Sequence, residues 1–314
     1  MKLKILLFAC AIALIPISYQ LYITAKPPFL KHDNNSCWND SAVWLLYNIP
    51  ELVDELIENK ISYEKENNFD VLFLADLLEA MRNQEKADDE NKNNKTKKEL
   101  DKTIKDAQKM FHQNVACPLT ETTHGDFGDA GLLFTTIIKK IPFYKDIISG
   151  YVSFSGSRTL TSKKTDIYKE YYNDKENILS INAPEKYLYL QSAHYAFDKD
   201  KKIETVLTFT EVDDDGKPTG NKHRYEFIGM ILGGGGHATA YIKNQREKGN
   251  PWYYCNDMGG TIKKADTKDF PLPLNWKNVN FEKETHPLIL LYKKLPDIKD
   301  VDNFAQALND IATK

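Results

Sequence analysis

The chain has 314 residues, enough for one large domain or two small ones with a sizeable buried core. Its composition, with 41% hydrophobic and 28% charged residues, is typical of a soluble globular protein. The formal net charge of -3 gives no overall attraction for nucleic acid, so we expect no nucleic-acid partner.

The first 25 residues differ from the rest of the chain. Lys2 and Lys4 precede the apolar run 5–17, and residues 18–25 carry no charge. A basic start, an apolar middle and a polar exit are typical of a secretory signal peptide. The apolar run is shorter than the roughly 20 residues that span a bilayer. We therefore expect residues 1–25 to be a cleaved signal and the protein to be secreted or exported. An uncleaved N-terminal membrane anchor is the alternative.

Helices are predicted in the first half of the chain. Apolar residues recur with helical spacing across 37–58, 69–81 and 129–140. Pro50 can begin a second helix or kink the first. The run 85–109 consists mostly of Lys, Asp, Glu and Asn, and we interpret it as a charged surface insertion, a solvated loop followed by an exposed helix, rather than a binding element.

Strands are predicted from about residue 150 onward, where segments rich in Tyr, Val, Thr and Phe alternate with turn signals. The expected strands are 187–197, 204–212, 224–232, 237–243, 252–256 and 287–293. Residues 213–216 are a candidate hairpin turn, and 296–314 a C-terminal helix or tail. Because helices come first and strands follow, the pattern predicts an α+β fold rather than alternating βαβ units.

Cys37 lies at the start of a predicted helix, after a cluster of small polar residues in which Asn35 or Ser36 can cap. The positive end of a helix dipole lowers the pKa of a cysteine, and the N–H groups there can hold an oxyanion. A small buried cysteine is the more common explanation of such a position alone. A nucleophile therefore needs a histidine and an orienting group elsewhere in the chain.

The other cysteines do not indicate a metal site. The chain has Cys10, Cys37, Cys117 and Cys255, and removal of the signal leaves three. An odd number cannot be fully paired, so at least one thiol stays free. No two of them have the CxxC spacing of a zinc ribbon. We predict no metal and no cofactor.

Four glycines, 233–236, lead into His237 at the start of a predicted strand. No GK[ST] and no helix follow, so a flexible loop that delivers the histidine to a cleft is favoured over a phosphate loop. The next strand ends in Asn256 and Asp257. An Asn or Asp there can lie beside the imidazole and fix its tautomer, although the pair can also simply begin a turn.

Together these segments resemble the ubiquitin-specific proteases. Residues 35–41, Asn-Ser-Cys-Trp-Asn-Asp-Ser, resemble the Cys box G-N-T-C-Y-x-N-S. Residues 236–241 with 252–257 resemble the His box G-H-Y-T-A-Y…W-Y-x-F-[DN]-D. Three weaker motifs agree in order, so the resemblance covers roughly 30–295. They lie at 128–134, 183–190 and 287–293.

The resemblance implies one catalytic domain with a papain-like cysteine protease fold over residues 30–295. A helical N-terminal thumb, a β-rich C-terminal palm and reduced fingers are expected, because the zinc-binding cysteines of the fingers are absent. The family hydrolyses the isopeptide or peptide bond after the C-terminal glycine of ubiquitin. By position, Cys37 is the nucleophile, His237 the base and Asn256 the third catalytic residue, and Asp257 can share or replace that third role. The expected partners are ubiquitin or ubiquitinated proteins, bound by a monomer.

The sequence departs from the family at the oxyanion position. The family's Asn five residues before the cysteine is His32 here, so His32, Asn34 and Asn35 are all oxyanion candidates. The glycine of the Cys box and the Gln and Glu of the middle helix are also missing. The Gly-Gly tail of the substrate requires a narrow channel, for which the candidate residues are Gly235, Gly236 and Trp38.

Two alternatives remain open. The chain can be a papain-like protease for another substrate or a ubiquitin-like protein, which the altered Cys box and the lost zinc cysteines allow. It can also be a catalytically weak homologue that binds ubiquitin without turnover, which His32 at the oxyanion position favours. A ubiquitin probe with a C-terminal electrophile that fails to label Cys37 would favour the first alternative, and ubiquitin binding without cleavage of a fluorogenic ubiquitin conjugate would establish the second.

Overall fold

The computed structural model describes 11 stretches of the chain. They are 26–90, 93–154, 179–181, 185–192, 202–203, 205–213, 217–234, 236–258, 262–265, 274–275 and 286–296. The predicted signal or anchor at 1–25 lies outside these residues, as do most of the C-terminal tail, the turn residues 214–216 and Gly235. Among the helices of the described stretches, none is both long and apolar enough to cross a bilayer.

Helices occupy the described chain up to residue 146. The α-helices are α2 (Cys37–Tyr47), α3 (Pro50–Glu58), α4 (Lys60–Lys65), α5 (Phe69–Asp89), α6 (Asn94–Phe111), α7 (Cys117–Leu119) and α8 (Ala130–Lys140). A π-helical turn, η1 (His112–Ala116), joins α6 to α7, and a 3₁₀ turn, η2 (Tyr144–Asp146), precedes the first strand.

The predicted helix over 37–58 is two helices. Asn48 ends α2, and Ile49 leaves the helical region at φ -109° and ψ 89° before Pro50 begins α3. The break follows from proline sterics, because the residue before a proline is disfavoured in the α region while proline itself suits the first turn. The break lets α3 turn away to pack on α5, while α2 remains against the sheet.

The charged run 85–109 is largely helical, so the predicted loop at its start is wrong. Helix α5 continues to Asp89, well past the predicted end at 81, and α6 begins at Asn94 with its first turn capped by Asn93. Ile104 and Phe111 of the weak apolar stripe are buried, and α6 packs along α5. Burial of that narrow stripe, rather than propensity, stabilises the pair.

The strands form one main sheet that is mostly antiparallel. The strand order is β1 (Ile148–Phe154), β3 (Tyr187–Ser192), β11 (His286–Lys294), β6 (Pro218–Gly234), β7 (His237–Lys243), β8 (Trp252–Cys255) and β9 (Lys263–Lys264). β5 (Val206–Val212) pairs with β6, and β2 (Leu179–Ile181) with β5. Only the β1–β3 and β2–β5 pairs are parallel among those described. A separate pair joins β4 (Lys202–Ile203) to β10 (Leu274–Asn275).

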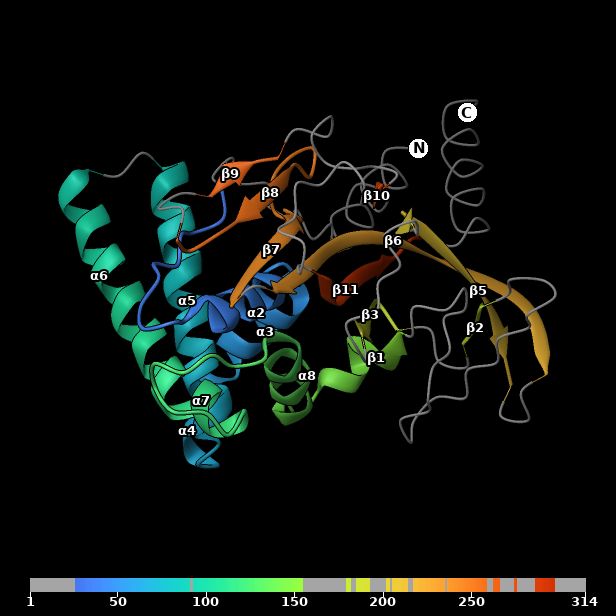
Figure 1. Cartoon of the computed structure of the whole chain (residues 1–314), viewed down its shortest axis with the longest axis horizontal. Coiled ribbons are helices and arrows are strands. Elements are labelled where there is room, and N and C mark those ends of the chain that lie inside the picture. The colour runs from blue at the N-terminus through green and yellow to red at the C-terminus, as the bar shows by residue number, and fades with distance from the viewer. Residues whose placement is uncertain are drawn as a thin grey trace, which may run out of the picture.

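The arrangement confirms the predicted α+β class, with helices first and strands after them. Each predicted strand overlaps an observed one, although β6 is much longer than 224–232 and residues 193–197 lie outside the described chain. In Figure 1, β2, β5 and one end of the bent strand β6 extend away from the helices. This extension is the candidate for the reduced fingers.

Helix α2 lies between the other helices and the sheet (Figure 1). All 11 of its residues are buried, as expected for a helix surrounded on every side. Its carboxyl end is tied to the sheet because the Asn48 side chain donates to the Ile228 carbonyl over 3.0 Å. Trp44 donates to the Pro28 carbonyl over 3.0 Å, which ties the helix to the segment before it. These contacts fix α2, and with it Cys37, against the sheet.

Candidate active site

Cys37 is held at the start of α2 by a tight turn. Asn34 and Asn35 adopt left-handed conformations with φ of 46° and 60°, which asparagine tolerates better than most residues. The predicted capping by Asn35 or Ser36 is not formed. Instead the Ser36 hydroxyl accepts from the Asp33 N–H over 3.0 Å and donates to the Asp40 carboxyl over 2.7 Å.

The sheet brings the other predicted catalytic residues together. β7 and β8 are antiparallel, with Ala240 opposite Cys255, so the start of β7 and the end of β8 lie at one edge. His237 begins β7, and Asn256 follows β8 directly. Because α2 packs on β7, this edge adjoins the start of the helix that carries Cys37.

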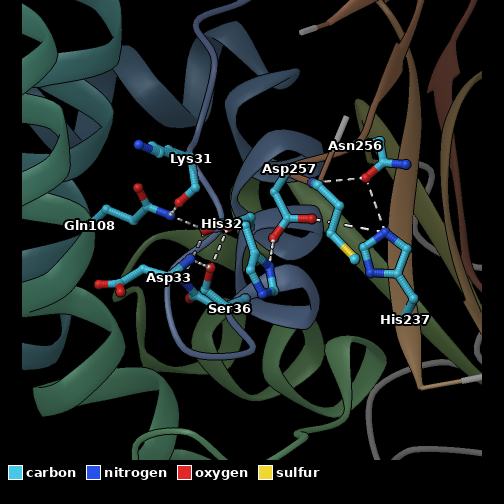
Figure 2. A network of polar contacts seen from close by, with 11 residues as sticks. Lys31, His32, Asp33, Ser36, Gln108, His237, Asn256 and Asp257 are labelled. Atoms are coloured by element: carbon cyan, nitrogen blue, oxygen red, sulfur yellow. Dashed lines mark hydrogen bonds and ion pairs between the residues drawn. The ribbon is translucent and has the colours of Figure 1, made fainter. Parts of the chain in front are cut away.

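The hydrogen bonds around Asn256 determine the tautomer of His237. The Met258 N–H donates to Asn256 Oδ1 over 3.0 Å, so this atom is an acceptor. His237 Nε2 lies 3.0 Å from the same oxygen (Figure 2), and therefore Nε2 carries the proton and donates. Nδ1 is left with its lone pair, is buried, and has no hydrogen-bond partner among the described residues. It is the nitrogen that can accept a proton.

The Cys37 sulfur lies beside β7, where the backbone N–H groups of Ala238 and Trp38 act to lower its pKa. The side chain is 2% exposed, and burial, with smaller effects from the Asp257 and Asp40 charges, raises its pKa from an ordinary 9.0 to about 11. The two N–H groups oppose this shift without reversing it. The N–H group at the helix start does act to lower the pKa of Cys37, as predicted, but burial outweighs it, so the expected thiolate is not favoured in the resting protein.

Asp257 stands between two histidines. Its carboxyl oxygen Oδ2 lies 2.6 Å from Nδ1 of His32, and Oδ1 lies 3.8 Å from Nε2 of His237 (Figure 2). The Asp257 side chain has no exposed surface, whereas that of His32 is 31% exposed. Asn256 is thus the direct partner of His237, and Asp257 fixes the ring of His32 while lying just beyond hydrogen-bond distance of His237.

The other two oxyanion candidates contact a neighbouring loop, residues 120–129. The Asn35 amide donates to the Gly125 carbonyl over 2.7 Å, and the Asn34 amide lies 3.4 Å from a ring nitrogen of His124. Both amides hold this loop beside the turn before Cys37. Of the three candidates, His32 is the one bonded to a residue of the His237 edge.

Two of the candidate channel residues, Trp38 and Gly236, contact this loop, whereas Gly235 lies outside the described residues. Trp38 is 2% exposed and packs edge-on against His112, and Gly128 lies so close that a Cβ there would be 2.6 Å from the Trp38 indole. Trp38 therefore supports the loop from beneath. Gly236 has a φ of +77° and faces the ring of Phe127, which is 60% exposed. The role of these residues in a channel stays a prediction.

Sequence reasoning missed Asp40 and Gln108. Asp40 is buried one turn after Cys37, and the Gln108 amide of α6 donates to its Oδ1 over 2.7 Å. The same amide donates to the Lys31 carbonyl over 3.0 Å. An acidic residue three positions after the nucleophile, on a helix that is mostly apolar after Ser41, is the one local signal that pointed to this cluster. No group of His, Cys, Asp and Glu side chains suited to a metal ion occurs within the described stretches.

No family model and no curated protein matches the sequence. Among solved structures, the chain is similar to one from the SAGA DUB module that contains Ubp8, Sgf11, Sus1 and Sgf73. The two are 14% identical with a TM-score of 0.46, over 88% of this chain and 69% of that one. It is also similar to the MERS coronavirus papain-like protease, at 14% identity and a TM-score of 0.34, over 87% of this chain and 67% of the other.

Proposed function

We propose that this chain is a cysteine hydrolase in which Cys37 is the nucleophile and His237 the general base. The observation that carries the proposal is the fixed tautomer of His237. Asn256 holds the proton on Nε2 and leaves the buried Nδ1 as a free base at the edge beside the Cys37 sulfur. A base with no other partner, oriented by a third group, is the arrangement that activates a thiol.

The reaction begins from a neutral thiol and a neutral imidazole. His237 Nδ1 takes the Cys37 proton as the sulfur attacks the substrate carbonyl, and later gives it to the leaving amine. The N–H groups of Ala238 and Trp38 stabilise negative charge on the sulfur while it exists. A donor near the turn before α2, for which His32 is the best placed candidate, stabilises the oxyanion, an effect of typically about 3 kcal/mol.

The substrate proposed is the C-terminal glycine of ubiquitin, joined to a lysine or to another peptide. Support comes from the Cys-box and His-box motifs, whose residues the fold assembles at one site. The extension of β2, β5 and β6 carries no zinc cysteines, so any grip on ubiquitin there is metal-free. The hydrophobic Phe127 and Met258, both exposed, lie beside the site and are available to the substrate's tail.

The test is covalent labelling with ubiquitin that carries an electrophile at its C-terminus. We expect wild-type protein to form one adduct at Cys37 and Cys37→Ala to form none. Cys117→Ser is the matched control, because Cys117 is also a buried free thiol but lies in α7, and it is expected to label normally. An adduct that persists in Cys37→Ala would sink the assignment of the nucleophile.

A second candidate is a ubiquitin-binding protein with little turnover. The raised pKa of Cys37 favours it, because a neutral buried thiol is a poor nucleophile without its base. Ubiquitin binding by wild-type protein, with no cleavage of a fluorogenic ubiquitin conjugate, would support this candidate. Failure of the ubiquitin probe to label Cys37 in the folded protein would instead indicate a protease for another substrate.

A further inference from the structure

Two acidic side chains are buried side by side beneath the nucleophile. Asp40 is 0% exposed and Asp257 3% exposed, and their carboxyl groups are in contact. Asp40 comes from α2 and Asp257 from the turn after β8, so the pair links the helix of Cys37 to the edge that carries His237. A negative charge on either carboxyl group would raise the pKa of the Cys37 thiol.

The other hydrogen bonds of Asp40 all have a neighbouring group as donor and Asp40 as acceptor. Asp40 accepts from the Ser36 hydroxyl over 2.7 Å and from Gln108 over 2.7 Å, with the Asn39 amide at 3.3 Å. Asp257 Oδ2 faces Nδ1 of His32. Among the described residues, Asp257 Oδ1 has no hydrogen-bond partner, although it is buried. If both carboxyl groups were ionised, two hydrogen-bond acceptors would face each other with no proton between them.

The titratable groups around Asp40 determine which carboxyl is neutral. Cys37 is on the same helix, and Asp257 faces Asp40 from the β8 side. His32 and His237 both lie on the far side of Asp257, so the imidazole rings near this pair face Asp257 and not Asp40. Asp40 has only neutral donors, and burial together with the Asp257 charge raises its pKa well above the ordinary range.

We propose that Asp40 holds the single proton of this pair at neutral pH and donates it to Asp257. Asp40 is then a positioning residue for the proposed reaction. Asp40 fixes the Asp257 carboxylate, which in turn holds His32. Because Asp40 is neutral, it adds no second negative charge near the Cys37 sulfur. The inference rests on the proposed function only in taking Cys37 as the reacting atom, and the measurements below require no ubiquitin.

The test compares Asp40→Asn with Asp40→Ala in the full chain. Asparagine has the shape of the protonated acid and can donate to Asp257, whereas alanine cannot. At neutral pH we expect iodoacetamide to alkylate Cys37 in Asp40→Asn within about twofold of the wild-type rate, because the neutral charge is kept. The ring signals of His32 in ¹H–¹⁵N spectra are expected to stay in place in Asp40→Asn and to move in Asp40→Ala. Asp54→Asn is the matched control, since Asp54 is an exposed carboxylate on α3.

Infrared spectroscopy gives a direct measurement of the proton. Wild-type protein and Asp54→Asn are expected to show the carbonyl band of a buried protonated carboxyl at neutral pH, and Asp40→Asn to lack it. A band that survives in Asp40→Asn would overturn the proposal. So would alkylation of Cys37 severalfold faster in Asp40→Asn at neutral pH, because a charged Asp40 would then have opposed the thiolate in wild type. If these results hold while the ubiquitin probe fails to react, the substrate is wrong and the proton assignment stands.

Discussion

We expect the thiol of Cys37 to titrate far above neutral pH. Burial is the largest cause of the rise in the pKa of Cys37 from an ordinary 9.0 to about 11, and the negative charge of Asp257 adds to it. At pH 7 this shift lowers the thiolate fraction about a hundredfold relative to an ordinary cysteine. Because a thiolate of higher pKa is more nucleophilic, about tenfold of the loss is recovered. Alkylation at pH 7 is therefore about tenfold slower than for an ordinary thiol, before limited access slows it further.

The assay is alkylation of the resting protein by iodoacetamide at a series of pH values, followed on the Cys37 peptide by mass spectrometry. The rate is expected to rise about tenfold for each pH unit up to the highest pH at which the protein stays folded. The same chain unfolded in urea is the control, and its rate should level off near an ordinary cysteine pKa. A rate in the folded protein that is already level below neutral pH would show a preformed thiolate–imidazolium pair and refute the reasoning.

Three further predictions concern the base, the loop beside the site and helix α8. His237→Gln is expected to lower kcat/KM on a fluorogenic ubiquitin conjugate about 10²- to 10⁴-fold, and activity near wild type would mean that another base acts. Gly128→Ala would place a Cβ 2.6 Å from the Trp38 ring and is expected to lose about 1–3 kcal/mol of unfolding free energy in urea. In Gly131→Ala the nearest atom is 3.3 Å away, so its stability is expected to be unchanged or up to about 1 kcal/mol higher, and equal losses in the two variants would contradict the packing. Asp129→Ala removes the acceptor for two N–H groups in the first turn of α8 and is expected to lose about 1 kcal/mol by the same measurement, whereas no loss would mean that the cap contributes nothing.

Local patterns were sufficient to predict the elements that carry the site. Cys37 begins a helix, His237 begins a strand and Asn256 follows the next strand, as the spacing of apolar residues and turn signals indicated. These features depend on neighbours within a few residues, so the sequence displays them directly. Asp257 lies 3.8 Å from His237, but its bond to His32 spans 225 positions, and no local pattern predicts that bond.

The pKa of Cys37 could not be predicted from its position in the helix. A helix terminus typically contributes about 0.3–1 kcal/mol, which is less than the 1.36 kcal/mol equivalent of one pKa unit. Burial of the sulfur and two nearby carboxyl groups act in the opposite direction and exceed it. Both depend on what tertiary packing places around the residue, as does the Gln108–Asp40 bond across 68 positions.

The complete burial of α2 limits how the site can respond to a substrate. Its residues are enclosed by the sheet and by α3 and α8, so Cys37 cannot shift without unpacking the core. Adjustment is then expected from residues 120–129, which are joined to the turn before Cys37 by the Asn34 and Asn35 side chains and rest on Trp38 at Gly128. Cys37 is thus expected to keep its place when a peptide binds. The entry of the peptide then depends on how easily the residues around Cys37 move.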